Sequence, residues 1–357
     1  MVNMIATEAG RINASLERLG SAGHPTVAVL EVTHRCNARC EYCFIDHAGV
    51  HPELSTEELL FVIDKLAGSG ILSLLITGGE PFMRADILRI IEHAISKDFF
   101  SVSLFTNGLL LTEEHLDFII RHKKYIAKIK MSAFSHIPRI NDSYFKVRGA
   151  MNTILKNGEK LIEHGLNVGL SIAAMDFNVA DLMETKLFYS KKKFDVTSSP
   201  FKIPGAKGDF AAVDSRSKEF MKQYFAHYPE ETKERFRRVM NERLEAPGDH
   251  LELCKGRITS LVVNPEGDIS PCTSFRALRF GSIFDTRPLR DILLSSEQYN
   301  RLRAMKKTDF EPCRTCKFIG FCNICPGIIY TATGELKRAD PQVCNHAETL
   351  YEILYGS

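Results

Sequence analysis

A regular alternation of two apolar patterns fills residues 26–198 and constrains the fold more than any other feature of the sequence. Six short apolar runs predict strands at 26–32, 71–77, 101–106, 126–134, 166–175 and 194–198. Five amphipathic runs predict helices at 55–68, 84–97, 112–122, 150–164 and 179–193. Strands separated by helices pair in parallel through right-handed crossovers. Because six units fall short of the eight of a closed barrel, the pattern predicts an α/β fold with a partial (β/α)6 barrel.

The length of 357 residues predicts more than one domain. We expect an N-terminal extension at 1–25, the TIM-like partial barrel at 26–200, a bridging helical segment at 201–251 and a cysteine-rich domain at 252–357. Residues 202–208 form either a bridge between domains or a loop over the active site. Residues 217–245 predict either a solvated amphipathic helical pair or a substrate-gripping lid, with an apolar side made of Phe220, Tyr224, Phe225, Phe236 and Val239.

The composition excludes several classes of protein. A hydrophobic content of 44% and a charged content of 25% exclude wholesale disorder. The formal net charge of +2 gives no reason to expect a nucleic acid or an anionic membrane as partner. No apolar stretch reaches the ~18 residues of a membrane span. The first 20 residues lack the apolar core of a secretory signal, so we expect a cytoplasmic protein.

The ten cysteines fall into two groups. Three stand near the N-terminus, the next 210 residues contain none, and seven follow in the last part of the chain. Disulfides are rare in a reducing cytosol. Clustering of this kind is typical of metal ligands, because several thiolates must reach one ion or cluster.

Polar and glycine-rich motifs follow the predicted strands. Residues 78–81 (Gly-Gly-Glu-Pro) follow the second strand and residues 106–108 (Thr-Asn-Gly) the third, while Ser132 lies near the end of the fourth and Ser171 on the fifth. Alone, each glycine motif is an ordinary turn. In parallel α/β folds, however, functional groups gather at the carboxyl ends of the strands. Together with the first cysteine group, these residues predict a site on one rim.

The first cysteine group supplies three thiolates, from Cys36, Cys40 and Cys43, with the spacing CxxxCxxC. A structural zinc site needs four ligands, and His34 or His47 could provide the fourth. An iron–sulfur cubane also normally takes four thiolates. With three, one iron keeps an open position that can bind a chelating ligand, which indicates catalysis rather than structure.

This spacing, with Tyr42 before the third cysteine and Gly-Gly-Glu-Pro further along the chain, resembles the radical S-adenosylmethionine (radical SAM) superfamily. The resemblance implies a SAM-binding [4Fe–4S] cluster on the three cysteines. It implies SAM contacts for Tyr42, Gly78, Gly79, Glu80, Asn107, Ser132, Arg148 and Ser171. Among these, residues 78–80 would hold the SAM amino group, and Arg148 could neutralise its carboxylate. The implied activity is reductive cleavage of SAM to a 5′-deoxyadenosyl radical that abstracts hydrogen from a substrate carbon; no catalytic acid or base stands out.

The C-terminal cysteines resemble the SPASM extension of radical SAM peptide maturases, which implies two auxiliary iron–sulfur clusters. The resemblance assigns Cys313, Cys316, Cys322 and Cys344 to a distal cluster. It assigns Cys254, Cys272 and Cys325 to a cluster nearer the active site. Two residues separate Cys322 from Cys325, whereas three are common in the SPASM family. Cys325 could therefore belong to the distal cluster and Cys322 to the nearer one. The three-cysteine cluster could have an open iron, a non-cysteine ligand or a smaller core. A zinc ribbon is the alternative to both clusters.

Three classes of function follow from these motifs. The first is a radical SAM/SPASM enzyme that crosslinks, oxidises or decarboxylates a ribosomally made peptide, with a flavodoxin- or ferredoxin-type reductant. Only some 25 residues precede the first strand, so leader recognition would need a separate protein, another surface or no leader. The second is radical oxidation or decarboxylation of a small molecule such as a tetrapyrrole, a sugar or a cofactor precursor. The third is a non-enzymatic zinc or electron-transfer protein.

Overall fold

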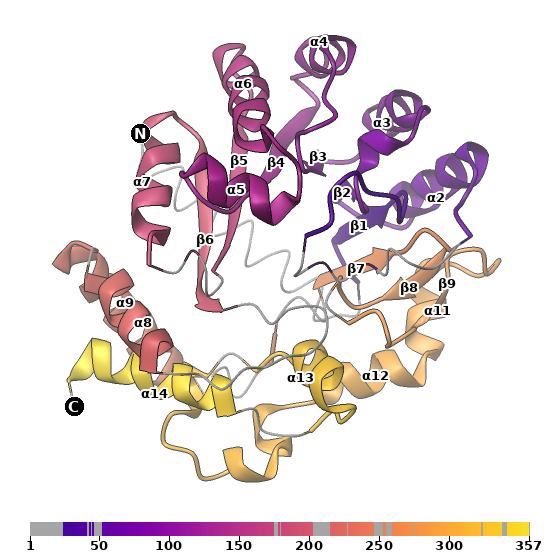
Figure 1. Ribbon diagram of the computed structural model, residues 1–357. Coiled ribbons are helices and arrows are strands. Elements are labelled where there is room, and N and C mark those ends of the chain that lie inside the picture. The colour runs from indigo at the N-terminus through magenta and orange to yellow at the C-terminus, as the bar shows by residue number, and fades with distance from the viewer. Residues whose placement is uncertain are drawn as a thin grey trace.

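The computed structural model describes residues 24–40, 43, 45, 52–174, 178, 180–202, 215–226, 228–245, 253–254, 259–273, 275–322, 324–337 and 341–356. A curved, mostly parallel sheet forms the centre of the molecule, and helices fan out along its outer side (Figure 1). The predicted α/β class with an open barrel is confirmed.

All six predicted strands are present. They are β1 (Val27–Glu31), β2 (Ser73–Thr77), β3 (Ser101–Thr106), β4 (Ile126–Ala133), β5 (Val168–Ala174) and β6 (Asp195–Lys202). Each pairs in parallel with the next along the chain. Residues such as Ala28 and Leu30 point outward into the apolar core, so the alternate positions of each strand face the inside of the barrel.

The five predicted helices are also present, as α2 (Thr56–Gly68), α3 (Ile87–Ile95), α4 (Glu113–Arg121), α6 (Ala150–Glu163) and α7 (Leu182–Lys191). The predicted capping box of α2 forms, since Ser55 Oγ accepts a hydrogen bond from the Glu58 N–H and the Glu58 carboxylate accepts one from the Ser55 N–H. Two short elements were not predicted, the 3₁₀ turn η1 (Pro81–Met83) and α5 (Pro138–Phe145). Both begin at a proline, which is favoured in the first turn of a helix.

The sheet continues beyond β1 into the C-terminal part of the chain, which the sequence did not predict. Strand β7 (Ser260–Val263) pairs in parallel with β1, and β8 (Asp268–Ser270) and β9 (Gly281–Ser282) follow in antiparallel order. The full order is β6-β5-β4-β3-β2-β1-β7-β8-β9. The loop after β8 is therefore brought to the barrel edge at β1.

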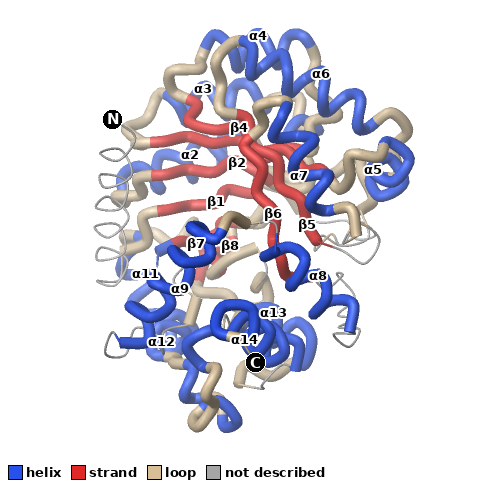
Figure 2. Tube along the Cα trace, turned by 90° about the vertical axis from the view of Figure 1, so that its left-hand side faces the viewer, coloured by secondary structure: helices blue, strands red, loops and turns tan. Residues whose placement is uncertain are grey.

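The predicted helical pair is present as α8 (Ser215–Ala226) and α9 (Glu230–Glu245). Of its predicted apolar side, Phe225 is buried, whereas Phe236 and Val239 are exposed. Helix α8 contacts both β6 and the last helix, α14 (Pro341–Tyr355), so it connects the barrel with the C-terminal region. Figure 2 shows α8, α13 and α14 gathered at one side of the sheet. Of the predicted bridge at 202–208, only Lys202 lies within the described residues.

The C-terminal region is built from short elements. They are α11 (Leu289–Ser295), α12 (Glu297–Ala304), η3 (Lys307–Asp309), η4 (Glu311–Cys313), η5 (Ile319–Phe321), α13 (Pro326–Thr333) and α14. A second apolar cluster, which includes Met305, Phe310 and Phe321, forms its core. In the part of the chain that the structure describes, no helix is long and apolar enough to cross a membrane.

Candidate active site

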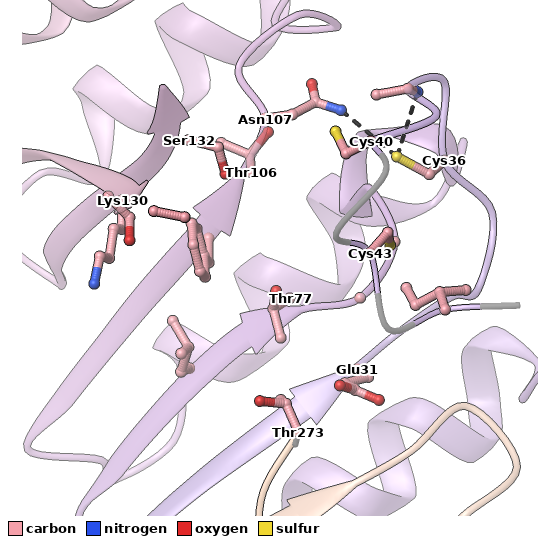
Figure 3. A pocket seen from close by; sticks show the side chains of 18 of the residues that line it. Glu31, Cys36, Cys40, Cys43, Thr77, Thr106, Asn107, Lys130, Ser132 and Thr273 are labelled. Atoms are coloured by element: carbon pink, nitrogen blue, oxygen red, sulfur yellow. Dashed lines mark hydrogen bonds between the residues drawn. The ribbon is translucent and has the colours of Figure 1, made fainter. Parts of the chain in front are cut away.

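A cavity of about 610 Å³ opens at the carboxyl ends of the parallel strands (Figure 3). Its wall contains most of the residues that the sequence placed on this rim: Cys36, Cys40, Cys43, Gly78, Gly79, Asn107, Ser132 and Ser171. The expected convergence of these residues is therefore observed.

The two glycines after β2 allow this loop to lie directly against the segment that leads to the cysteines. The Gly79 N–H donates to the Thr33 carbonyl and the Glu80 N–H to the Arg35 carbonyl, both at 2.8 Å. A Cβ on Gly79 would lie 2.4 Å from the Arg35 carbonyl oxygen and 2.7 Å from that of His34. A Cβ on Gly78, whose φ is +151°, would lie 2.6 Å from the Thr33 carbonyl oxygen. The motif is thus more than a turn, because it fixes the start of the cysteine loop.

Glu80 links the loop after β2 to the loop after β3. Its buried carboxylate accepts hydrogen bonds from the Thr106 hydroxyl (2.6 Å), the Asn107 N–H (2.6 Å) and the Phe82 N–H (3.1 Å). Burial raises the pKa of Glu80 to about 7, and the three hydrogen bonds oppose this rise. The carboxylate does not line the cavity in this structure; it links the loops after β2 and β3.

Asn107 reaches from the loop after β3 to the cysteine loop. Its amide nitrogen donates to Asn37 Oδ1 at 2.7 Å and lies 3.8 Å from Cys36 Sγ, a contact drawn in Figure 3. Its amide oxygen accepts from the Leu109 N–H at 2.9 Å. Hydrogen bonds to a ligating sulfur tune the potential of an iron–sulfur cluster. Asn107 is therefore placed to act on Cys36.

The three thiols of the rim fit an iron–sulfur cluster better than a zinc ion. In the described residues, no three His, Cys, Asp or Glu side chains could hold a single metal ion. His34, one candidate fourth ligand for zinc, instead bonds Glu266 at 2.8 Å; His47 lies outside the described residues. Burial and the neighbouring thiols raise the pKa of Cys40 to about 12. A cationic iron cluster would supply the positive charge that holds such thiols as thiolates.

Among the described residues, Arg148 joins Glu80 as a predicted SAM contact that does not line the cavity. Arg148 is exposed between α5 and α6. Tyr42 lies outside the described residues. Conversely, Glu31, Lys130 and Arg276 line the cavity although they were not predicted. Period-two alternation could have found Lys130, because it lies two positions before Ser132 on β4.

A second, smaller cavity of about 40 Å³ brings together all four cysteines assigned to the distal cluster. Cys313, Cys316, Cys322 and Cys344 line it together with apolar residues of η5 and α14. Cys325 is not among them, which favours Cys322 over Cys325 in the four-cysteine set. Neither of the two cavities is lined by Cys254, Cys272 or Cys325, so the structure does not gather the three-cysteine set there.

A buried lysine supports anionic thiolates at the smaller cavity. Lys307 is only 1% exposed, and its ammonium donates to the Ile319 carbonyl at 3.0 Å. Burial raises the pKa of Cys322 to about 12, and the Lys307 charge acts against this rise. Because a buried ammonium is costly without nearby negative charge, four thiolates around an iron–sulfur cluster fit this setting.

A partial barrel with three thiols at its rim and a second cysteine centre in a C-terminal domain defines a class of iron–sulfur enzyme. Comparison with known proteins agrees: residues 30–188 match the radical SAM superfamily, and residues 254–317 match SPASM, an iron–sulfur cluster-binding domain. The chain belongs to the radical SAM superfamily and carries a SPASM domain. It is an enzyme whose cofactors are SAM and iron–sulfur clusters, which argues against the non-enzymatic alternative.

Similar proteins match along most of the chain. The antilisterial bacteriocin subtilosin biosynthesis protein AlbA of Bacillus subtilis is 26% identical over 84% of this chain and 67% of its own length. The PqqA peptide cyclase of Granulibacter bethesdensis is 26% identical over 89% of this chain and 86% of its own. The AdoMet-dependent heme synthase of Methanosarcina barkeri is 24% identical over 89% of this chain and 95% of its own.

The fold is shared with solved structures. Streptococcus suis SuiB bound to its precursor peptide SuiA has a TM-score of 0.68 and 17% sequence identity, covering 95% of this chain and 80% of that one. At this identity the likeness extends to the fold alone. When bound, the cluster and SAM would supply the radical chemistry, and the chain would position them.

We expect Cys322→Ala and Cys325→Ala to damage different auxiliary clusters, because only Cys322 belongs to the four-cysteine cavity. Cys322→Ala should lose about four irons per chain. Both variants should still cleave SAM without substrate, since neither residue lines the main cavity. Iron analysis and Mössbauer spectra measure the loss of each cluster, and 5′-deoxyadenosine assays measure SAM cleavage. The same spectral loss in both variants, or full product yield from Cys325→Ala, would contradict the assignment.

Proposed function

We propose that this enzyme modifies a ribosomally synthesised peptide, by abstracting hydrogen from a carbon and then crosslinking, oxidising or decarboxylating it. The observation that carries the proposal is the match of both domains to relatives with peptide roles. AlbA is named for the biosynthesis of subtilosin, a bacteriocin, and PqqA peptide cyclase for its peptide substrate. Both matches extend over more than four fifths of this chain.

The proposal assigns roles to the two cysteine centres. Cys36, Cys40 and Cys43 hold the SAM cluster, and the rim residues Gly78, Gly79, Asn107, Ser132 and Ser171 hold SAM. The four cysteines of the small cavity hold the distal auxiliary cluster, and Cys254, Cys272 and Cys325 hold the nearer one. Oxidation of a peptide by two electrons needs an acceptor for the second electron, which an auxiliary cluster provides.

Further parts of the proposal concern organisation and partners. The domain limits remain those expected at 1–25, 26–200, 201–251 and 252–357. A flavodoxin- or ferredoxin-type protein delivers the electron for SAM cleavage. Any leader of the peptide is bound by a separate protein or by another surface of this chain. None of these partners is a nucleic acid or a membrane.

A small carboxylated substrate is the second candidate. The heme synthase of Methanosarcina barkeri matches 95% of its own length, and Lys130 and Arg276 place two cationic side chains in the cavity wall. Such cations suit the propionates of a tetrapyrrole. The peptide proposal is preferred because AlbA and PqqA peptide cyclase are both 26% identical to this chain, against 24% for the heme synthase.

The two candidates give different products in one assay. The anaerobically reconstituted enzyme receives SAM, dithionite and either a short peptide encoded beside its gene or a propionate-bearing porphyrin. We expect the peptide to lose about two hydrogens in mass and to pass deuterium from a labelled carbon to 5′-deoxyadenosine. Deuterium transfer only from the porphyrin would overturn the peptide proposal.

A further inference from the structure

Glu31 is a buried carboxylate in the wall of the main cavity that no role described so far uses. It ends strand β1 and is 1% exposed, yet it lines the cavity from the inner face of the barrel. Figure 3 shows Glu31 and Thr273 on one side of the cavity and Lys130 and Ser132 on the other. Ser132 on β4 thus lies across the cavity from Glu31, whereas Thr77, which directly precedes Gly78, is the neighbour of Glu31 in the sheet.

Only one of the two carboxylate oxygens of Glu31 is occupied. Oε1 accepts a hydrogen bond from Arg276 Nη2 at 2.5 Å. Arg276 comes from the loop after β8, and its Nε donates to the Thr273 carbonyl at 3.2 Å, which fixes the guanidinium. Oε2 is buried and has no hydrogen-bond partner among the described residues. Because buried polar atoms are normally satisfied, this oxygen calls for a donor that a bound molecule supplies.

The electrostatics of Glu31 point the same way. Burial raises its pKa to about 7, even though Arg276 acts to lower it. A buried ion pair such as Glu31–Arg276 can often be replaced by apolar side chains without lowering the free energy of unfolding. The pair therefore contributes little to folding stability. The position of Glu31 is better explained by a ligand than by the fold.

The opposite wall offers the complementary charge. Lys130 is half-buried beneath Ser132 on β4, and its ammonium lies 5.6 Å from the centre of the Phe105 ring. The neighbouring Lys128 is neutralised by Asp195, whereas no carboxylate among the described residues lies within ion-pair distance of Lys130. One wall therefore presents an acceptor and the other a donor, and a peptide unit carries both an N–H and a carbonyl oxygen.

We propose that Glu31 Oε2 accepts a hydrogen bond from a backbone N–H of the substrate, with Arg276 holding the carboxylate in place and Lys130 meeting a carbonyl across the cavity. The inference rests on the proposed function, because it takes the substrate to be a peptide. It makes Glu31 a substrate-binding residue distinct from the residues that hold SAM.

The experiment measures binding of a defined probe to the full-length, cluster-replete protein loaded with SAM. The probe is acetyl-trialanine amide, and the matched probe carries a methyl group on every backbone nitrogen, which removes the N–H donors. Calorimetry gives the affinity, and infrared difference spectra report the carboxylate band. We expect the unmethylated probe to shift that band and to bind about tenfold more tightly than the methylated one. This comparison needs no variant.

The variant Glu31→Gln gives the second readout. Arg276 should hold the amide oxygen, which turns the amide N–H₂ toward the cavity and places a donor against a donor. We expect about tenfold weaker probe binding, no carboxylate band shift, and SAM affinity within about twofold of the wild type. The control is Glu57→Gln, an exposed glutamate of α2 whose variant should match the wild type in every measurement.

Three results would overturn the inference. The first is equal affinity for both probes. The second is a Glu31→Gln variant whose band shift and probe affinity match the wild type. The third is a loss of SAM binding in this variant with probe binding intact. The last would place Glu31 in the SAM site. Failure of the enzyme to alter any peptide would instead count against the proposed function while leaving these binding results standing.

Discussion

Replacing Cys36, Cys40 and Cys43 by alanine together should abolish formation of 5′-deoxyadenosine. These three thiols line the main cavity, and a cluster with three protein ligands has no further cysteine to replace one that is lost. Iron content should fall by about four atoms per chain, while the iron of the C-terminal domain remains. Chromatography of the nucleoside product and iron analysis under anaerobic conditions measure both effects.

Cys344→Ala is the matched control for this triple variant. Cys344 lies in the smaller cavity, so its loss should also lower the iron content while SAM cleavage continues. Nucleoside formation by the triple variant at more than a few per cent of the wild-type rate would remove these cysteines from the SAM site. Loss of cleavage in Cys344→Ala alone would show that the two centres are not independent.

Gly79→Ala should be the most damaging single-methyl change in the barrel. The added Cβ would lie 2.4 Å from the Arg35 carbonyl oxygen and 2.7 Å from that of His34, and backbone atoms cannot swing aside as a flexible side chain could. Overpacking of this kind costs about 1–3 kcal/mol in the free energy of unfolding. The displaced segment leads directly into Cys36, so we expect SAM cleavage to fall by at least about tenfold. Denaturant unfolding and the nucleoside assay measure the two effects.

Gly68→Ala provides a control on the same protein. A Cβ on Gly68, at the end of α2, would have no atom within 4 Å, so this variant should be at least as stable as the wild type and cleave SAM at the same rate. Gly79→Ala with normal stability and activity would mean that the loop after β2 can move away from the cysteine segment without consequence. The close approach of the two backbones would then not be needed for the site.

The sequence predicted the barrel well because its signals are local. Each strand and helix of residues 26–198 carries its own periodicity, and the capping box before α2 marks a helix start within four residues. Strand β7 escaped prediction because its four residues gain their position only by pairing with β1. Helix α5 escaped because its eight residues include few apolar ones to set a period.

The sequence predicted which residues lie at the cavity better than it predicted which way their side chains point. Motif placement after successive strands brought Asn107, Ser132 and Ser171 to one cavity. It could not tell which way the Glu80 carboxylate turns, since that depends on donors from the next loop, at Thr106 and Asn107. Glu31 was passed over because a glutamate at the end of an apolar strand has no motif of its own; its partner Arg276 lies far along the chain.

The pairing of β1 with β7 also bears on how the molecule is assembled during synthesis. Val27 and its partner Ser260 are separated by more than 200 residues, so the first strand leaves the ribosome long before its second neighbour exists. Until then β1 is an uncovered apolar edge, open to pairing with another nascent chain. A chaperone that covers this edge during synthesis would prevent such pairing. Iron would best be delivered after the C-terminal half has emerged.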